Sequence, residues 1–338
     1  MPNKPKICVI NTGGTILSRF NQQAGGWVSS AGVADLAAQL PQVAALAELQ
    51  VFEHSQINAY RMDLDTVLGI GRLVNEVVKD PSCDGVVVVH GTASMEETAY
   101  LLELTVDTQK PVVLTGAQRR FEDIGADGPV NFLHAVRLAA TPAARGRGVM
   151  VVFDGSVHGA RDVLKIHNQS LNGFGSRDGG AIAFVTATRV TFLACPDRRA
   201  HFPVPPSAPN VQLIKVAQGS DDILVRACIA SKVDGIVIEG VGGGGVPDAV
   251  FQGICDALAV GIAVVVVARL PRGGVIPDGG GGGTGGGDYA LNGSSGNLIA
   301  SGAIPGGYLS GLKARILLMI ALASTRDRAE LARIFDRA

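Results

Sequence analysis

Short runs of consecutive aliphatic residues recur along the chain, and none of these runs alternates with polar residues. A strand that is apolar at every position is covered on both faces, as parallel strands between helices are. The runs span residues 7–10, 86–89, 112–114, 149–153, 236–238 and 262–267. Apolar residues repeat at helical spacing over residues 34–40, 64–78, 95–106, 130–139, 312–323 and 329–335. This succession of strands and helices predicts an open α/β sheet.

A proline-rich stretch divides the pattern into two cycles. Four prolines fall between residues 203 and 209, where the chain can sustain neither a helix nor a central strand. We therefore expect two α/β domains joined by a linker at residues 196–210. The larger N-terminal domain, residues 1–195, would hold an open sheet of mostly parallel strands, and residues 211–338 would form a smaller C-terminal α/β domain.

Composition excludes several classes of protein. With 47% hydrophobic and 17% charged residues, the chain buries a large core and differs from disordered chains. A formal net charge of −1 leaves no basic surface for the phosphates of a nucleic acid. Apolar runs such as residues 262–268 are far shorter than the roughly 20 residues of a membrane span, and residues 7–10 are too few for a signal-peptide core. We expect a cytoplasmic protein with no nucleic-acid or membrane partner.

Neither a metal nor a cofactor is expected. The five cysteines include no CxxC pair, and the six histidines show no HExxH spacing. Gly240 to Gly245 formally fits the GxGxxG pattern, but an apolar run replaces the acidic residue that a dinucleotide fold needs about 20 positions later. We interpret this segment as a flexible strand-to-helix loop. The lysine-free stretch from Gly279 to Gly287 is interpreted as a mobile surface loop.

Segments that combine glycine with hydroxyl residues follow four of the expected N-terminal strands. They lie at residues 11–15, 90–94, 115–119 and 154–157. Ligands bind at the carboxyl ends of the strands in an open α/β sheet. Glycine lets the backbone approach a ligand, and threonine supplies a hydroxyl that bonds or attacks it. One such segment would be an ordinary turn, but several at one edge of the sheet favour a functional site.

A threonine hydroxyl becomes a good nucleophile only when a base or a positive group activates it. Lys165 is the candidate for this role, because a lysine sequestered from water has a lowered pKa and acts as a base. A solvated surface charge is the alternative for this residue. His90 also follows a strand, but no Ser-His-Asp arrangement surrounds it in the sequence. We interpret His90 as a hydrogen-bonding residue at the strand end.

At these positions the chain resembles a known family, the bacterial-type L-asparaginases and glutaminase-asparaginases. The motifs are Thr-Gly-Gly-Thr-Ile at residues 12–16, His-Gly-Thr at 90–92 with Met-Glu-Glu-Thr-Ala at 95–99, and the stretches 125–129 and 159–163 with Lys165. The resemblance implies a small-molecule amide substrate and a homodimer or homotetramer with active sites near the dimer interface.

Residue roles follow from the same resemblance. Thr15 corresponds to the nucleophile that forms an acyl-enzyme, and Thr92 and Lys165 correspond to the residues that assist proton transfer and position the attacking water. The lid of the family carries a tyrosine that helps activate the nucleophile. The corresponding positions here are, for substrate binding, Gly14, Ala59, Tyr60, Gly91, Ala93, Ala117 and Gln118, and, for the lid, Gly26 and Trp27.

The chain departs from the family where that family binds the α-amino-acid head of its substrate. Ala93 takes the place of an aspartate, and Ala59 and Tyr60 take the places of a serine and a glutamine. The loop from which family members offer an asparagine to the neighbouring subunit has become glycine at residues 243–245. Each lost charge-assisted hydrogen bond is worth about 1.5–3 kcal/mol, so two or three together would weaken recognition of asparagine by several orders of magnitude.

Three functions are compatible with these residues. We favour an amidohydrolase whose substrate lacks the usual α-amino-acid head. The first alternative is a conventional cytoplasmic L-asparaginase in which neighbours such as Tyr60, Arg61 or Asp63 replace the missing groups. The second is a catalytically silent ligand-binding protein. Retention of both threonines and Lys165 argues against a silent protein, which has no use for them.

Overall fold

The chain divides into two compact units, Met1–Val204 and Pro205–Ala338, each with its own sheet and core. The computed structural model describes residues 4–196, 201–276 and 292–337. The stretch from Gly279 to Gly287 lies outside the described residues. None of the helices in the described part combines the length and apolar character needed to cross a membrane.

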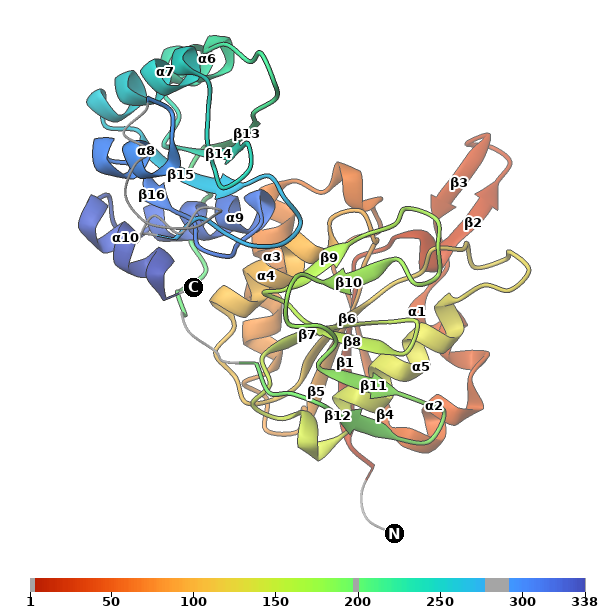
Figure 1. Cartoon of the computed structure of the whole chain (residues 1–338). Coiled ribbons are helices and arrows are strands. Elements are labelled where there is room, and N and C mark those ends of the chain that lie inside the picture. Colours follow the sequence, from red (N-terminus) through yellow and green to blue (C-terminus); the bar gives the residue numbers. More distant parts are fainter. Residues whose placement is uncertain (1–3, 197–200, 277–291, 338) are drawn as a thin grey trace. The chain divides into compact units, whose positions relative to one another are not determined.

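The N-terminal unit is built on an eight-stranded sheet with the order β12-β11-β8-β7-β6-β5-β1-β4 (Figure 1). Its parallel strands are β1 (Lys6–Asn11), β4 (Glu48–Glu53), β5 (Gly85–Val89), β6 (Val112–Thr115) and β7 (Val149–Phe153). Antiparallel pairing extends it with β8 (Ser156–Gly159), β11 (Ala183–Val185) and β12 (Val190–Phe192). The expected open, mostly parallel sheet is confirmed.

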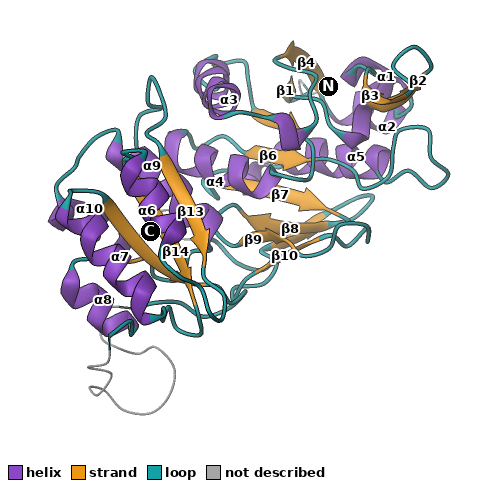
Figure 2. Ribbon diagram, turned by 90° about the horizontal axis from the view of Figure 1, so that it is seen from above, coloured by secondary structure: helices purple, strands orange, loops and turns teal. Residues whose placement is uncertain are grey.

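Helices cover both faces of this sheet. On one face lie α3 (Leu64–Val77) and α4 (Met95–Thr105), and on the other lie α1 (Val33–Ala38), α2 (Pro41–Leu46) and α5 (Gly128–Ala139) (Figures 1 and 2). On the second face, Ile7 and Val9 of β1 share a core with Leu36 and Phe132. Because the neighbouring strand residues are buried on the opposite face, the central strands are apolar at nearly every position.

Short elements at the edge of the sheet carry several of the residues singled out above. Two antiparallel hairpins are formed by β2 (Ser18–Asn21) with β3 (Gly26–Ser29) and by β9 (Val163–Lys165) with β10 (Phe174–Ser176). The 3-10 turns are η1 (Thr15–Leu17), η2 (Ala59–Arg61) and η3 (Pro142–Ala144). Thr15 therefore opens η1, and Lys165 ends β9.

The C-terminal unit contains a parallel sheet with the order β13-β14-β15-β16. Its strands are β13 (Val211–Lys215), β14 (Gly235–Gly240), β15 (Ala263–Ala268) and β16 (Ile304–Pro305). One face packs on α6 (Ile223–Ala230), α7 (Asp248–Ala259) and α8 (Ser295–Ser301), and the other on α9 (Gly311–Leu322) and α10 (Arg328–Asp336). This is the expected smaller α/β domain.

The glycine-rich segment from Gly240 to Gly245 connects β14 to α7. A backbone bridge between Val241 and Gly245 closes it into a tight turn, in which Gly242 and Gly244 have φ angles of 56° and 102°. Its place between a strand and a helix agrees with the sequence interpretation, and the glycines serve the positive φ angles of the turn.

Candidate functional site

The turn that follows β1 is bound to the sheet by its first residues. The Asn11 side-chain oxygen accepts a hydrogen bond from the Gly13 backbone N–H at 2.9 Å, and the Thr12 hydroxyl donates to the Val89 carbonyl at 2.9 Å. The hydroxyl of Thr12 thus supports the structure of the turn. Thr15, at the start of η1, is half-buried at the carboxyl end of the sheet.

The turns after β1 and β5 are in direct backbone contact. Gly14 has a φ angle of 95°, and a Cβ atom at this position would lie only 2.6 Å from the backbone of Gly91. A Cβ atom on Gly91 would in turn lie 2.8 Å from the Cβ of Ala59. Side chains in these two places would push the turns apart, so glycine is what allows the segments of Thr15 and Thr92 to meet.

The segment after β6 joins the same cluster. A Cβ atom on Gly116 would lie 2.4 Å from the His90 carbonyl oxygen, and the methyl group of Thr92 is 3.4 Å from that point. Ala117 follows and is buried. Segments after β1, β5 and β6 therefore converge with η2 at one edge of the sheet, as expected for the carboxyl ends of parallel strands.

Lys165 reaches this cluster from the β9–β10 hairpin. Its Nζ donates a hydrogen bond to Thr92 Oγ1 at 2.6 Å, and Thr92 is only 7% exposed. Burial lowers the pKa of Lys165 from its usual value, and the nearby negative charge of Glu96 opposes this shift in part. A lysine with a lowered pKa spends more time as a neutral amine, which can accept a proton from the hydroxyl beside it.

His90 is fully buried and is bonded on both ring nitrogens. Nδ1 lies 2.7 Å from the Gly91 carbonyl oxygen, and Nε2 lies 3.0 Å from Thr98 Oγ1. Burial lowers the pKa of His90 to about 4, so the ring is neutral near pH 7. A neutral ring has a single N–H, which must face the carbonyl, so Nε2 accepts the hydroxyl proton of Thr98. This geometry agrees with a structural role for His90.

The Gln118 side chain is held by the main chain of a neighbouring loop. Its Nε2 donates to the His167 and Ser170 carbonyl oxygens, each at 3.0 Å. Among the positions that the family resemblance assigns to substrate binding, Gln118 thus also fixes the loop that follows Lys165. Tyr60 lies differently: it is 76% exposed, and its phenol oxygen accepts a hydrogen bond from the Asn58 amide at 3.2 Å.

Ala59 and Ala93 present small side chains at this edge. Ala59 is buried, whereas Ala93 is exposed in the turn between β5 and α4. The Ser94 hydroxyl donates to the Ala59 carbonyl oxygen at 3.2 Å. The Asp63 carboxylate caps α3 by accepting from the Thr66 backbone N–H and hydroxyl, and these bonds lower its pKa. The Ser94 hydroxyl and the Asp63 carboxylate therefore already have partners within the protein.

A supporting residue that the sequence reasoning missed is Asp127. Its carboxylate accepts hydrogen bonds from the backbone N–H groups of Gln118 and Arg119 and from the Asn131 side chain, at 2.8–3.1 Å. The Asn131 amide also donates to the Gly116 carbonyl. The motif at residues 125–129 was recognisable in the sequence, but these partners are several residues away and only the fold brings them to it.

The lid positions Gly26 and Trp27 lie in β3, paired with Asn21 and Phe20 of β2. The segment that the resemblance assigns to the lid is therefore a β-hairpin, and Trp27 is 37% exposed. Residues 243–245 belong to the C-terminal unit.

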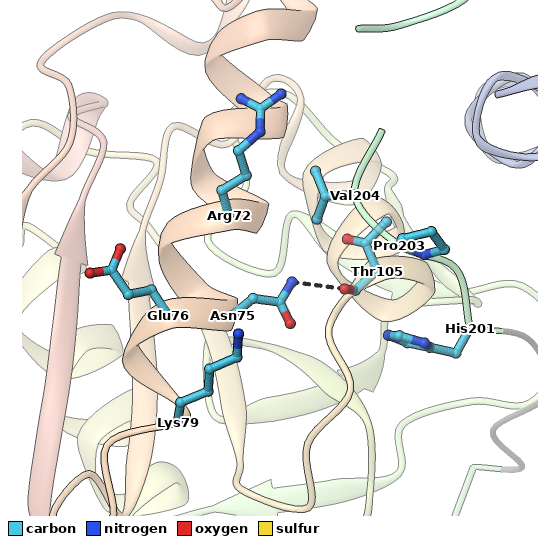
Figure 3. A pocket seen from close by; sticks show the side chains of 8 residues that line it. All are labelled: Arg72, Asn75, Glu76, Lys79, Thr105, His201, Pro203 and Val204. Atoms are coloured by element: carbon cyan, nitrogen blue, oxygen red, sulfur yellow. Dashed lines mark hydrogen bonds between the residues drawn. The ribbon is translucent and has the colours of Figure 1, made fainter. Parts of the chain in front are cut away.

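A separate hollow lies along α3 in the N-terminal unit (Figure 3). It has a volume of about 380 Å³, and two of the residues that line it are joined by a hydrogen bond of 2.8 Å from the Asn75 amide to the Thr105 carbonyl. Arg72, Lys79 and His201 also line it. None of the residues assigned to the site above lines this hollow. Within the described residues there is also no cluster of three or more His, Cys, Asp or Glu side chains that would hold a metal ion.

Comparison with known proteins covers nearly the whole chain. Residues 6–198 match the family model described as Asparaginase, N-terminal, and residues 210–335 match the Glutaminase/Asparaginase C-terminal domain. An L-asparaginase of Bacillus licheniformis is 33% identical over 325 residues, which are 95% of this chain and 97% of that protein. L-asparaginase 2 of Escherichia coli (strain K12) is 31% identical over 98% of this chain and 93% of its own length.

A solved structure extends the likeness to three dimensions. The crystal structure of a probable cytoplasmic L-asparaginase from Campylobacter jejuni has a TM-score of 0.87 and 29% sequence identity, and the match covers 99% of this chain and 100% of that one. Matched family models over both domains, relatives above 30% identity and a shared fold lead to one conclusion. The chain belongs to the asparaginase family of hydrolases, which act on amide C–N bonds.

Proposed function

We propose that Thr15 is the nucleophile of an amidohydrolase and that Thr92 and Lys165 form its proton-transfer pair. The observation that carries the proposal is the 2.6 Å hydrogen bond between Lys165 Nζ and Thr92 Oγ1, made by a lysine whose pKa is lowered by burial. The backbone contact between Gly14 and Gly91 supports it, because it brings the Thr15 and Thr92 turns to one place.

The reaction has two halves. In the first, Thr15 Oγ1 bonds to the amide carbon, its proton passes to the amide nitrogen, and the C–N bond breaks to release ammonia. In the second, water attacks the acyl–Thr15 ester while the neutral amine of Lys165 and the Thr92 hydroxyl take up its proton. The ester C–O bond then breaks, the proton returns to Thr15, and a carboxylic acid leaves.

Trapping the acyl-enzyme tests these roles. The Thr92→Val variant lacks the hydroxyl that takes up the proton of the attacking water. Incubation of this variant with substrate should leave an acyl group on the peptide that contains Thr15. Thr15→Ala should show no such adduct and no ammonia release, while its circular dichroism spectrum stays unchanged. An acyl group mapped to any other residue, or normal turnover by Thr15→Ala, would contradict the assignment.

We further propose that the substrate is a small amide without an α-ammonium group. Ala93 stands where the family carries a carboxylate, and an incoming ammonium group would lose hydration there without gaining a partner. Two polar side chains close to Ala59 and Ala93 in the sequence support this interpretation, since the Asp63 carboxylate caps α3 and the Ser94 hydroxyl is bound to the Ala59 carbonyl. Tyr60, another candidate replacement, is largely exposed and bonded to Asn58.

A conventional L-asparaginase is the second candidate function. The names of the Bacillus licheniformis and Escherichia coli relatives favour it, because both are L-asparaginases that match over nearly all of this chain. Comparing the hydrolysis of L-asparagine with that of its desamino analogue succinamate separates the two candidates.

The assembly and location that we propose follow the family. We expect a homodimer or homotetramer, as the family resemblance implies, with neither nucleic acid nor membrane as a partner. A cytoplasmic location is supported by the likeness to the probable cytoplasmic L-asparaginase from Campylobacter jejuni. Sedimentation analysis at micromolar concentration tests the assembly, and a fully active monomer would contradict it.

A further inference from the structure

We infer that Arg120 is a positioning residue, which fastens the β2–β3 hairpin through Trp27 and thereby holds the nucleophile Thr15 in place. The inference rests on the proposed role of Thr15. It concerns the loop of residues 119–127, which follows β6 and in which Arg120 lies outside the recognised motifs.

Two cation–π contacts join the hairpin to this loop. The guanidinium carbon of Arg120 lies 3.9 Å from the centre of the Trp27 ring, and that of Arg19 lies 4.9 Å from the centre of the Phe121 ring. Each element thus contributes one cation and one aromatic ring. Phe20 stands edge-on to Trp27 at 5.4 Å between ring centres and supports the indole from the hairpin side. Trp is the aromatic ring that attracts a cation most strongly, and Arg is the more frequent cation in such pairs.

Arg120 is fixed in orientation by its own loop. Its Nε donates to the Asp123 carboxylate at 3.0 and 3.1 Å, so the flat face of the guanidinium remains available to the indole. The loop is anchored at its base by Asp127, which binds the backbone N–H groups of Gln118 and Arg119. The loop that carries the Arg120 guanidinium is therefore anchored at the carboxyl end of β6, next to the candidate site.

The hairpin is tied directly to the turn that carries Thr15. β2 begins at Ser18, immediately after η1, and the Ser18 hydroxyl donates to the Gly14 carbonyl at 3.1 Å. After β3, the backbone N–H groups of Ser30 and Ala31 both donate to the Leu17 carbonyl, at 3.1 and 3.0 Å. Both ends of the hairpin are thus bonded to the backbone on either side of Thr15. A displacement of the hairpin will therefore be transmitted to the nucleophile.

The test uses Trp27 as its own probe, because it is the only tryptophan of the chain. In Arg120→Ala, we expect acrylamide to quench the fluorescence of Trp27 more strongly and kcat to fall by about 3- to 10-fold, with a smaller change in KM. Unfolding followed by circular dichroism should change little, because both partners are partly exposed. The matched control is Arg147→Ala, which removes a cation–π contact of the same 3.9 Å length, to Phe192 of β12. This control should leave kcat and quenching at wild-type values.

A double-mutant cycle decides whether Arg120 acts through the indole. In a Trp27→Leu background, Arg120→Ala should cause almost no further loss of kcat, because the contact is already absent. Additive losses, or wild-type kcat and quenching in Arg120→Ala, would overturn the inference. If the wild-type protein cleaves no amide at all, the proposed function fails instead, and the quenching comparison still tests the contact itself.

Discussion

Replacing Lys165 with methionine removes the ammonium group while keeping most of the length and the apolar stem of the side chain. The hydrogen bond to Thr92 Oγ1, 2.6 Å long, disappears, and the hydroxyl loses the group that takes its proton. A charge-assisted hydrogen bond is worth about 1.5–3 kcal/mol, which corresponds to roughly 10- to 150-fold in rate. Loss of the proton-transfer group typically costs about 10²–10⁴-fold, so we expect kcat to fall within that range.

The stability of the protein, in contrast to kcat, should change little in Lys165→Met. Burial already disfavours the charged form of Lys165, as the direction of its pKa shift indicates. Methionine has no charge to desolvate, so the free energy of unfolding should change by less than about 1 kcal/mol. Lys110→Met is the matched control, because Lys110 Nζ donates to the Val78 and Asp80 carbonyls, away from the site. It should lower stability slightly and leave kcat unchanged.

The pH profile gives a second readout of the same residue. The pKa of Lys165 is lowered in the folded protein, so the neutral amine becomes available as pH rises toward that lowered value. In the wild type, kcat should therefore rise with pH as the pH approaches the pKa of Lys165. This alkaline limb of the pH profile should be missing in Lys165→Met. Ammonia release measured across the alkaline range checks this. Wild-type kcat in Lys165→Met, or an unchanged alkaline limb, would refute the proposed role and leave Lys165 as an ordinary surface charge.

Two further predictions concern the supports of the site. Asp127→Ala leaves the backbone N–H groups of Gln118 and Arg119 without their acceptor, so the free energy of unfolding should fall by about 2–4 kcal/mol in denaturant titrations; an unchanged midpoint would count against it. His90 has its pKa lowered to about 4 in the folded protein, so stability should decline as pH falls from 6.5 toward 4 while the unfolded state gains the proton. The free energy of unfolding of His90→Gln should decline less over that pH interval. An equal dependence of stability on pH in both proteins would exclude His90 as a cause.

The central strands of the N-terminal sheet could be predicted because each is a short run of consecutive apolar residues, which indicates a strand buried on both faces. Residues 86–89 form a continuous run of valine, and β5 is buried at every position between two layers of helices. The same reasoning missed the six-residue strand β4, which lies at the edge of the sheet and has no fully buried residue. It also missed β8, β11 and β12, which are three or four residues long. Strands of this length pair because their neighbours in space align them, and they carry too few positions for a periodic signal.

The sequence predicted the parts of the candidate site in which hydroxyl residues lie next to glycine, but not the contacts between those parts. The sequence alone indicates that Gly14 and Gly91 lie in turns, but the contact between them depends on the parallel pairing of β1 with β5. Lys165 was selected by type and family likeness, whereas its bond to Thr92 spans 73 residues of chain. The resemblance assigned Trp27 to the lid, but nothing in the sequence indicated its partner, because Arg120 lies in no recognised motif.

The most direct test of the substrate proposal is the ratio of kcat/KM for succinamate to kcat/KM for L-asparagine, measured in the wild type and in Ala93→Asp. Ala93 offers a methyl group at the position where the family has a carboxylate, so an α-ammonium group gains no partner there. We predict that the wild type prefers succinamate by at least about 10-fold, the worth of one lost charge-assisted bond. Ala93→Asp should shift the preference toward L-asparagine and harm the native reaction. Efficient hydrolysis of L-asparagine by the unmodified protein would contradict the proposal and would mean that another residue already binds the amino group.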